Sequence, residues 1–224
     1  MKKISLKNLL SVICPLLVSP CVYAVDATPI NTVQKQFTAA NSQQELMATA
    51  NSFYDLTMGG SGWVHNSAWL YMKLKKDVQY TVNATADQSA AGFHPGLACF
   101  YRPQGAGLVG IEYMYDHMYS QYNSHVEKNM VEEVTKRKLG TFKSYFIVNG
   151  YDRDGMENPL PVEYQQGTVI GMVDVGKNSK PGSVTLSFVP EKSGYYQCVM
   201  GGINPDVGLD LRSKYKVTVT VFGL

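Results

Sequence analysis

The amino-acid sequence predicts a mainly β protein, an antiparallel β-sandwich with one or two short helices. Fifteen tyrosines and 20 glycines among 224 residues, with few strong helix formers, favour strands and turns over helices. Short segments rich in β-branched or alternating apolar residues recur along the chain, and turn residues separate them. About 200 residues of this kind suit a single domain.

Eight segments carry the strand pattern, one after another along the chain. They are Ala68–Leu74, Val78–Ala86, Gly96–Arg102, Thr141–Val148, Thr168–Val175, Val184–Val189, Tyr195–Met200 and Tyr215–Phe222. The turn from Pro190 to Gly194 is expected to join the strands on either side of it as a hairpin. Glycines at 59, 60 and 62 predict that a loop enters a strand at Trp63.

Two segments favour helices. In the first, the Asn-Ser pair at 41 and 42 offers an N-cap, and Leu46, Ala50 and Phe53 fall on one helical face. The second runs over residues 119–137, where polar and charged side chains dominate. These are the one or two short helices of the predicted sandwich.

The N-terminal segment predicts a signal peptide over residues 1–24. Lys2 and Lys3 form a positive n-region, an apolar stretch follows from Leu9 to Val18, and Ala24 ends a small-residue cleavage site. We expect the mature chain, residues 25–224, to be one β-rich domain that is secreted or held at the outer cell surface, with the periplasm as the alternative. No later run approaches the ~20 apolar residues of a membrane helix, so we expect peripheral surface association.

Cleavage changes both the charge and the cysteine count. Three lysines and no acidic residue leave with the leader, so 20 basic residues become 17 against 18 acidic ones, a net charge of −1. This balance argues against a nucleic-acid partner. Cys99 and Cys198 remain, and an oxidising compartment favours a disulfide between them. It would close a loop of roughly 100 residues and stabilise the fold by up to ~4–5 kcal/mol.

The triplet Trp63-Val64-His65 is the strongest chemical signal. If it is extended, the indole and the imidazole leave the same face of the strand and can share one pocket. An oxidisable indole beside an imidazole in a secreted protein points to a redox-active metal, copper above all. The plainer interpretation is a packed tryptophan and a hydrogen-bonded histidine.

Three further histidines are candidate ligands. In a helix, Met114, His117 and Met118 would share a face and offer soft ligands suited to Cu(I); in a strand, His117 would instead share its face with tyrosines 113 and 115. His94 follows Phe93 and precedes Pro95 and Gly96, a context typical of a solvated loop histidine. His125, among polar residues, is expected at the surface.

Other metal or catalytic motifs are weak. Residues 152–157 place carboxylates around Gly155 in the manner of a calcium loop, but they lack the distal Glu of an EF-hand, so a plain turn is the preferred interpretation. The sequence contains no His-Glu-x-x-His zinc motif, no Gly-x-Ser-x-Gly elbow and no phosphate-binding glycine loop. Neither cysteine is followed by the histidine of a blue-copper site. We therefore expect no enzymatic activity.

Trp63-Val64-His65, followed some fifty residues later by His117 in a β-rich chain with a leader, resembles a known family. This is the CorA/MopE family of copper-repressible surface proteins of methane-oxidising bacteria. The resemblance implies a mononuclear copper site in which Trp63, oxidised to kynurenine, and His65 are two ligands. His117 is the match for the third ligand, and His94 is the competing choice.

The function implied by the resemblance is copper scavenging or delivery, with one copper ion per chain and an outer-membrane copper uptake protein as a partner. Calcium is a weaker candidate ligand. The main alternative is a surface interaction or carbohydrate-binding sandwich that uses tyrosines as stacking platforms and carries no copper. A copper oxidase or oxygenase is a third interpretation, for which no general acid or base is placed by a motif.

Overall fold

The computed structural model describes residues 24–29, 34–56, 60–63, 66–88, 90–105, 107–115, 118–119, 125–152, 155, 180–203 and 205–224. Within them the chain forms fifteen strands in three sheets and no helix. The mainly β class is therefore confirmed. In these residues no helix is long and apolar enough to cross a membrane.

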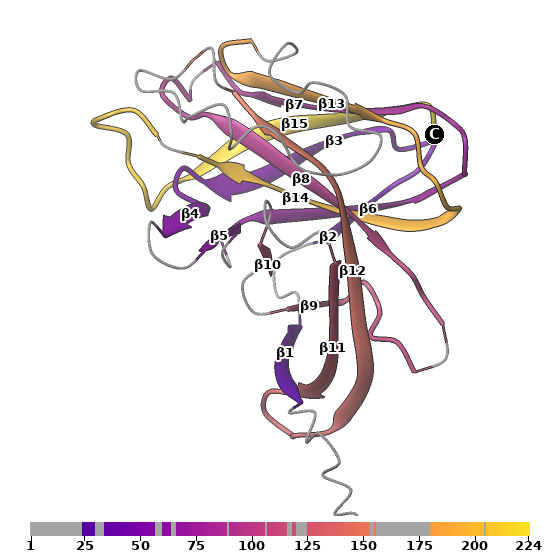
Figure 1. Cartoon of the computed structure of the whole chain (residues 1–224). Coiled ribbons are helices and arrows are strands. Elements are labelled where there is room, and N and C mark those ends of the chain that lie inside the picture. The colour runs from indigo at the N-terminus through magenta and orange to yellow at the C-terminus, as the bar shows by residue number, and fades with distance from the viewer. Residues whose placement is uncertain are drawn as a thin grey trace, which may run out of the picture.

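The largest sheet has eight strands, and it provides one layer of a sandwich (Figure 1). Its order is β2 (Gln34–Phe37), β6 (Ala68–Leu74), β14 (Gly194–Gly202), β8 (Pro95–Arg102), β12 (Lys138–Tyr151), β11 (His125–Glu132), β1 (Val25–Pro29) and β9 (Tyr113–Tyr115). Most neighbours are antiparallel, but β2 runs parallel to β6 and β1 runs parallel to β11.

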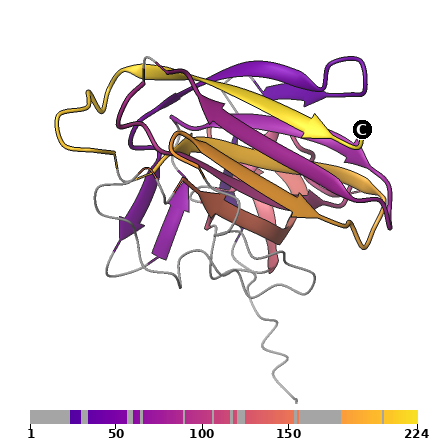
Figure 2. The same ribbon diagram turned by 90° about the horizontal axis from the view of Figure 1, so that it is seen from above.

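A four-stranded antiparallel sheet forms the other layer, in the order β13 (Ser183–Phe188), β7 (Tyr80–Ala86), β15 (Lys214–Phe222) and β3 (Gln43–Thr49). Seen from above, it lies over the strands of the eight-stranded sheet (Figure 2). Alternate residues of both sheets point inward, as in β15, where three valines are buried between exposed or half-buried neighbours. This alternation encloses the first core, which includes Leu70, Val82, Leu186 and Val219.

The other face of the eight-stranded sheet buries a second core. The residues of β6, β8 and β14 that do not face the four-stranded sheet contribute Trp69, Phe100 and Val199. Phe142 and Met130 from β12 and β11 close this core, because β12 is long and carries an irregularity between Phe146 and Val148. In Figure 1, β11, β1 and the far part of β12 extend below the sandwich.

The predicted disulfide is present between Cys99 and Cys198. The two cysteines are direct partners in the ladder of β8 and β14, and both are buried in the first core. The bond therefore joins neighbouring strands of one sheet and does not connect the two layers.

Both predicted helices are wrong where the structure describes them. The first is β3, whose Leu46 and Ala48 alternate with exposed residues and which pairs with β15. A strand face and a helix face share Leu46 and Ala50, so the pattern fits both periods, and the pairing with β15 selects the strand. The second begins at the last residue of β10 (Met118–Tyr119) and includes β11, which pairs antiparallel with β12.

The turn from Pro190 to Gly194 does not form the predicted hairpin. It connects β13 of the four-stranded sheet to β14 of the eight-stranded sheet, and so crosses from one layer to the other. Turn chemistry marks where the chain reverses but does not say which strands pair. Of the eight predicted strands, seven coincide with observed ones; Thr168–Val175 lies outside the described residues.

Candidate metal centre

Trp63 ends β5 (Gly60–Trp63), the central strand of the small third sheet. β5 lies between β4 (Phe53–Leu56) and β10, and Trp63 is paired with Phe53 on one side and Met118 on the other. The glycines at 60 and 62, expected in a loop, are part of this strand. The sheet thus brings Trp63 beside a segment more than fifty positions later in the chain.

Of the three predicted copper ligands, the structure describes the backbone of Trp63. The backbone of Trp63 is placed by its two pairings, whereas His65 and His117 lie outside the described residues. His117 directly precedes Met118 in the sequence, and Met118 is the ladder partner of Trp63. Paired Cα atoms of antiparallel strands lie about 4.5–5.5 Å apart, so the Cα atoms of Met118 and Trp63 are separated by that distance.

The helical alternative for the methionine-rich segment is wrong. Residues 113–115 form β9, which pairs with β1, and residues 118–119 form β10. Met114 and Met118 therefore do not share a helical face. Tyr113 is half-buried and packs against the second core, so it is not the exposed stacking residue that a carbohydrate site would use.

His94 is not the solvated loop residue that its sequence context suggests, because it is 3% exposed. Its Nδ1 lies 3.2 Å from Oδ2 of Asp152, and its Nε2 lies 2.9 Å from Oδ1 of Asp206. Each ring nitrogen of His94 faces a carboxylate oxygen, an arrangement that favours the protonated imidazole, in which both nitrogens donate. Burial alone would lower the pKa of His94, but the bonds to Asp152 and Asp206 outweigh it, and the pKa is raised.

These three residues form a histidine cluster, defined as His94, Asp152 and Asp206, in which a carboxylate oxygen faces each of the two imidazole nitrogens that a metal would need. Asp152 is fully buried, and its carboxylate also accepts hydrogen bonds from the backbone N–H groups of Gly155 and Gly182. The carboxylate expected at the head of the calcium-like loop is thus engaged by the protein itself. Among the described residues, no group of three or more His, Cys, Asp or Glu side chains converges on a metal position.

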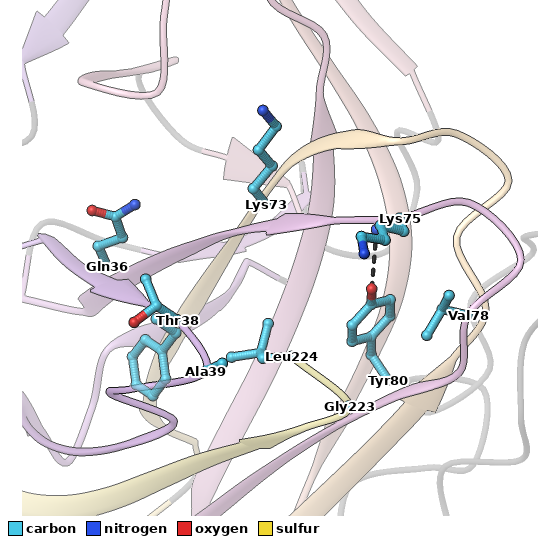
Figure 3. A pocket seen from close by; sticks show the side chains of 10 residues that line it. Gln36, Thr38, Ala39, Lys73, Lys75, Val78, Tyr80, Gly223 and Leu224 are labelled. Carbon is cyan, nitrogen blue, oxygen red and sulfur yellow. Dashed lines mark hydrogen bonds between the residues drawn. The ribbon is translucent and has the colours of Figure 1, made fainter.

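An open cavity of about 370 Å³ lies elsewhere, between β2, β6 and the start of β7. Figure 3 shows Gln36, Lys73 and Tyr80 among its lining residues, with the Tyr80 hydroxyl accepting a hydrogen bond from the backbone N–H of Lys75. No His, Cys, Asp or Glu lines this cavity, so it lacks the ligands of a copper site.

A second buried polar group was not predicted from the sequence. We call it the arginine cluster: Arg102, Gln197 and the backbone carbonyls of residues 109, 110, 111 and 113 that they bind. The guanidinium of Arg102 is 1% exposed and lies 4.2 Å from the centre of the Phe142 ring. Burial lowers its pKa to about 9, and the charge of Glu112 opposes the shift. One signal was available, because Arg102 continues the buried alternation of Ala98 and Phe100.

The sequence matches the family model described as copper(I)-binding protein CorA-like over residues 25–210. It is 31% identical to the structure of CorA from Methylomicrobium album BG8, described as a surface-associated copper-binding protein important in copper acquisition. That match covers 86% of this chain and 98% of the other, with a TM-score of 0.68.

A second solved structure is the secreted protein MopE of Methylococcus capsulatus, in which an oxidised tryptophan facilitates copper binding. It is 16% identical, the match covers 92% of this chain and 97% of that one, and the TM-score is 0.57. At this identity the likeness shows the fold alone. No curated protein matches the sequence.

Proposed function

Because this chain belongs to the copper(I)-binding CorA-like family, we propose that it binds one copper ion outside the cytoplasm and serves in copper acquisition. The family consists of copper-binding proteins, and the proposed role is capture and delivery without catalysis. The related CorA is surface-associated, which fits the leader predicted for residues 1–24. An outer-membrane uptake protein is the proposed recipient of the metal.

The proposed ligands are Trp63, after conversion to kynurenine, and the imidazoles of His65 and His117. The observation that supports this set is the pairing of Trp63 with Met118, since Met118 directly follows His117. His65 is two positions from Trp63 and so belongs to the same short segment. The contacts of His94 with two carboxylates also favour His117 as the distant ligand.

The chemistry of the donor set fits copper. An intact indole N–H is a donor without a lone pair for a metal, so Trp63 cannot be a ligand unmodified. Addition of dioxygen across the pyrrole double bond gives N-formylkynurenine, and hydrolysis then releases formate and leaves an aryl amine. This amine and two neutral imidazoles make a sparse nitrogen set, which suits Cu(I).

The first experiment measures the copper content of the mature protein from its native host, together with the mass of the peptide that contains Trp63. We expect one copper per chain and the kynurenine mass. Copper bound to protein with an unmodified Trp63 would contradict the kynurenine ligand but keep the two histidines. Absence of copper after loading with Cu(I) would contradict the function itself.

The second experiment replaces single histidines. His65→Ala and His117→Ala should each abolish tight copper binding, because each removes one of three ligands. His125→Ala is the matched control, since it removes a histidine near His117 in the sequence and should leave the copper content unchanged. Normal copper content in His65→Ala would overturn the proposed site.

A further inference from the structure

Arg102 is a buried cation whose hydrogen-bonding capacity is completely used. Its Nε donates to the carbonyl of Lys143 at 3.0 Å, Nη1 donates to Tyr113 O at 3.2 Å and to Oε1 of Gln197, and Nη2 donates to Val109 O and Gly110 O. These are five N–H groups and five neutral oxygen acceptors. Such a fork is specific to arginine, because a lysine ammonium has only three donors and no planar geometry.

Gln197 extends the same arrangement. Its Oε1 accepts from Arg102, and its Nε2 donates to Ile111 O at 2.8 Å and to Oε1 of Gln34 on β2. Between them, the two side chains bind the carbonyls of residues 109, 110, 111 and 113. One short stretch of backbone is therefore held by two side chains of the central strands β8 and β14.

This stretch also has backbone contacts. The backbone of residues 107–109 bonds to Thr141, and Gly140 permits the approach, because a Cβ there would collide with the carbonyl oxygen of Gly107. Residues 111 and 112 form a turn outside any sheet, and β9 begins directly after them at Tyr113. Within the stretch, the N–H of Tyr113 donates to Gly110 O at 3.5 Å, and Tyr113 is the ladder partner of Pro29 on β1. Arg102 and Gln197 supply the side-chain hydrogen bonds that hold the carbonyls of the turn.

The held stretch leads into the candidate copper site. From Tyr113, the chain passes through β9 to β10, where Met118 pairs with Trp63. Only four positions separate Tyr113 from His117, at most about 13 Å of extended chain. A shift at the start of β9 therefore reaches the segment of His117 with little chain available to absorb it, and a metal site tolerates displacements of only about 0.5 Å.

We propose that Arg102, supported by Gln197, is a positioning residue for the copper site, which holds the start of β9 so that the segment of His117 meets the strand of Trp63. This inference rests on the proposed copper function. It assigns no metal contact to Arg102. The two side chains act as the outer support of a ligand, as hydrogen-bonded groups behind metal ligands commonly do.

The test compares Arg102→Met, Arg102→Lys and Gln197→Leu with Leu186→Ala, a control that opens a cavity in the first core, which these residues do not contact. Two quantities are measured on folded protein: the Cu(I) affinity by ligand competition, and amide hydrogen exchange of residues 107–119 without metal. Thermal unfolding identifies variants with a loss of stability equal to that of the control.

We expect Arg102→Met to weaken the Cu(I) affinity at least tenfold and to accelerate exchange in residues 107–119. Arg102→Lys should show a smaller loss, and Gln197→Leu should act in the same direction if Arg102→Met fails to fold. Leu186→Ala should lose stability with the affinity and the exchange of residues 107–119 unchanged. An Arg102→Met protein that matches Leu186→Ala in all three measurements would overturn the inference.

The two hypotheses fail separately. If the wild-type protein binds no Cu(I), the proposed function is wrong. Hydrogen exchange in the metal-free variants still decides whether Arg102 positions the segment, because that measurement needs no copper. Unchanged exchange in Arg102→Met and Gln197→Leu would overturn the positioning role whatever the outcome with copper.

Discussion

The two ends of β8 each bury a cation, and they compensate its charge in different ways. Just before the strand, two carboxylates flank the imidazole of His94, whereas at its end five neutral oxygens surround the guanidinium of Arg102. Imidazole exchanges its proton near neutral pH, but the guanidinium stays charged there even with its pKa lowered to about 9. The end at His94 is thus sensitive to pH, whereas the end at Arg102 depends mainly on hydrogen-bond geometry, with the charge of Glu112 nearby.

The two clusters also differ in the segments that they hold, and this difference distinguishes a role in the fold from a role in the proposed copper site. The histidine cluster links segments that come together at one end of the sandwich: residue 94, residue 152, residue 206 and the backbone of Gly182. Most bonds of the arginine cluster go to the carbonyls of residues 109–113, which precede the segment of His117, and single bonds go to Lys143 and Gln34. A buried charge can therefore serve the fold or a site, and its acceptors show which segment depends on it.

The largest expected loss of stability comes from removal of the Cys99–Cys198 disulfide, which lies on β8 between the histidine cluster and the arginine cluster. Replacement of Cys99 and Cys198 by serine should lower the free energy of unfolding by about 4–5 kcal/mol, because the disulfide closes a loop with a sequence separation of 99. Urea denaturation measures this loss. Since the bond ties β8 to β14 at the middle, both clusters should lose protection from hydrogen exchange alike; loosening of one end only would show that the two ends are independent.

The second-largest effect is a difference in stability loss between variants of the two carboxylates in the histidine cluster. Asp152→Ala should cost about 3–5 kcal/mol, because it leaves a buried imidazolium and two backbone N–H groups without their acceptor. Asp206→Ala is the matched control: the Asp206 side chain is 24% exposed, water can replace it, and the expected cost is about 1 kcal/mol. If urea denaturation gave the same loss of unfolding free energy for both variants, the distinction between the buried Asp152 and the partly exposed Asp206 would be wrong.

The smallest effect is a dependence of stability on pH. Because the pKa of His94 is raised in the folded protein, the folded state binds this proton more tightly than the unfolded chain does. The resulting stabilisation is complete below pH 6.5 and is lost as the pH rises through the folded-state pKa.

Denaturation of the wild type and His94→Gln across this range checks the prediction. The wild type should lose stability toward alkaline pH, and the variant should lose less over the same interval. Gln197→Leu is the comparison in the arginine cluster and should keep the wild-type slope, because it removes a partner of Arg102 without removing a titratable group. A wild type whose stability rises with pH over this interval would contradict a protonated His94.

Much of the architecture follows from local pattern. The strand Ala68–Leu74 has the predicted bounds, and the strands β13 and β15 follow from alternation, because a half-buried strand needs side chains of opposite character on its two faces. β14 also matches a predicted strand, although it is buried on both faces along most of its length. The disulfide followed from the count of cysteines that remain after the leader. Residues 43–49 fit both the helical and the strand period, and residues 125–132 lie in a segment predicted to be helical because polar and charged side chains dominate it. The partners β15 and β12 decide for strands in both cases.

In the candidate site, too, some features were predictable from the sequence and others were not. The Trp-x-His triplet and the distant His117 identified the family from residue types alone, and the family model confirms that membership. His94 was misjudged because sequence cannot show that Asp152 and Asp206, 58 and 112 positions away, meet its two nitrogens. Arg102 was overlooked because its acceptors are mainly backbone carbonyls, which carry no signature in the sequence.

By itself, the sequence determined the β class, the cysteine pair and the family, since each depends on residue types at short range or on a simple count. Only the tertiary structure decided which strands pair, where the turn at 190–194 leads, and which charged side chains are buried together. Those outcomes depend on contacts between positions far apart in the chain, as in the pairing of Trp63 with Met118. Such contacts form only when the whole chain buries its apolar faces at once.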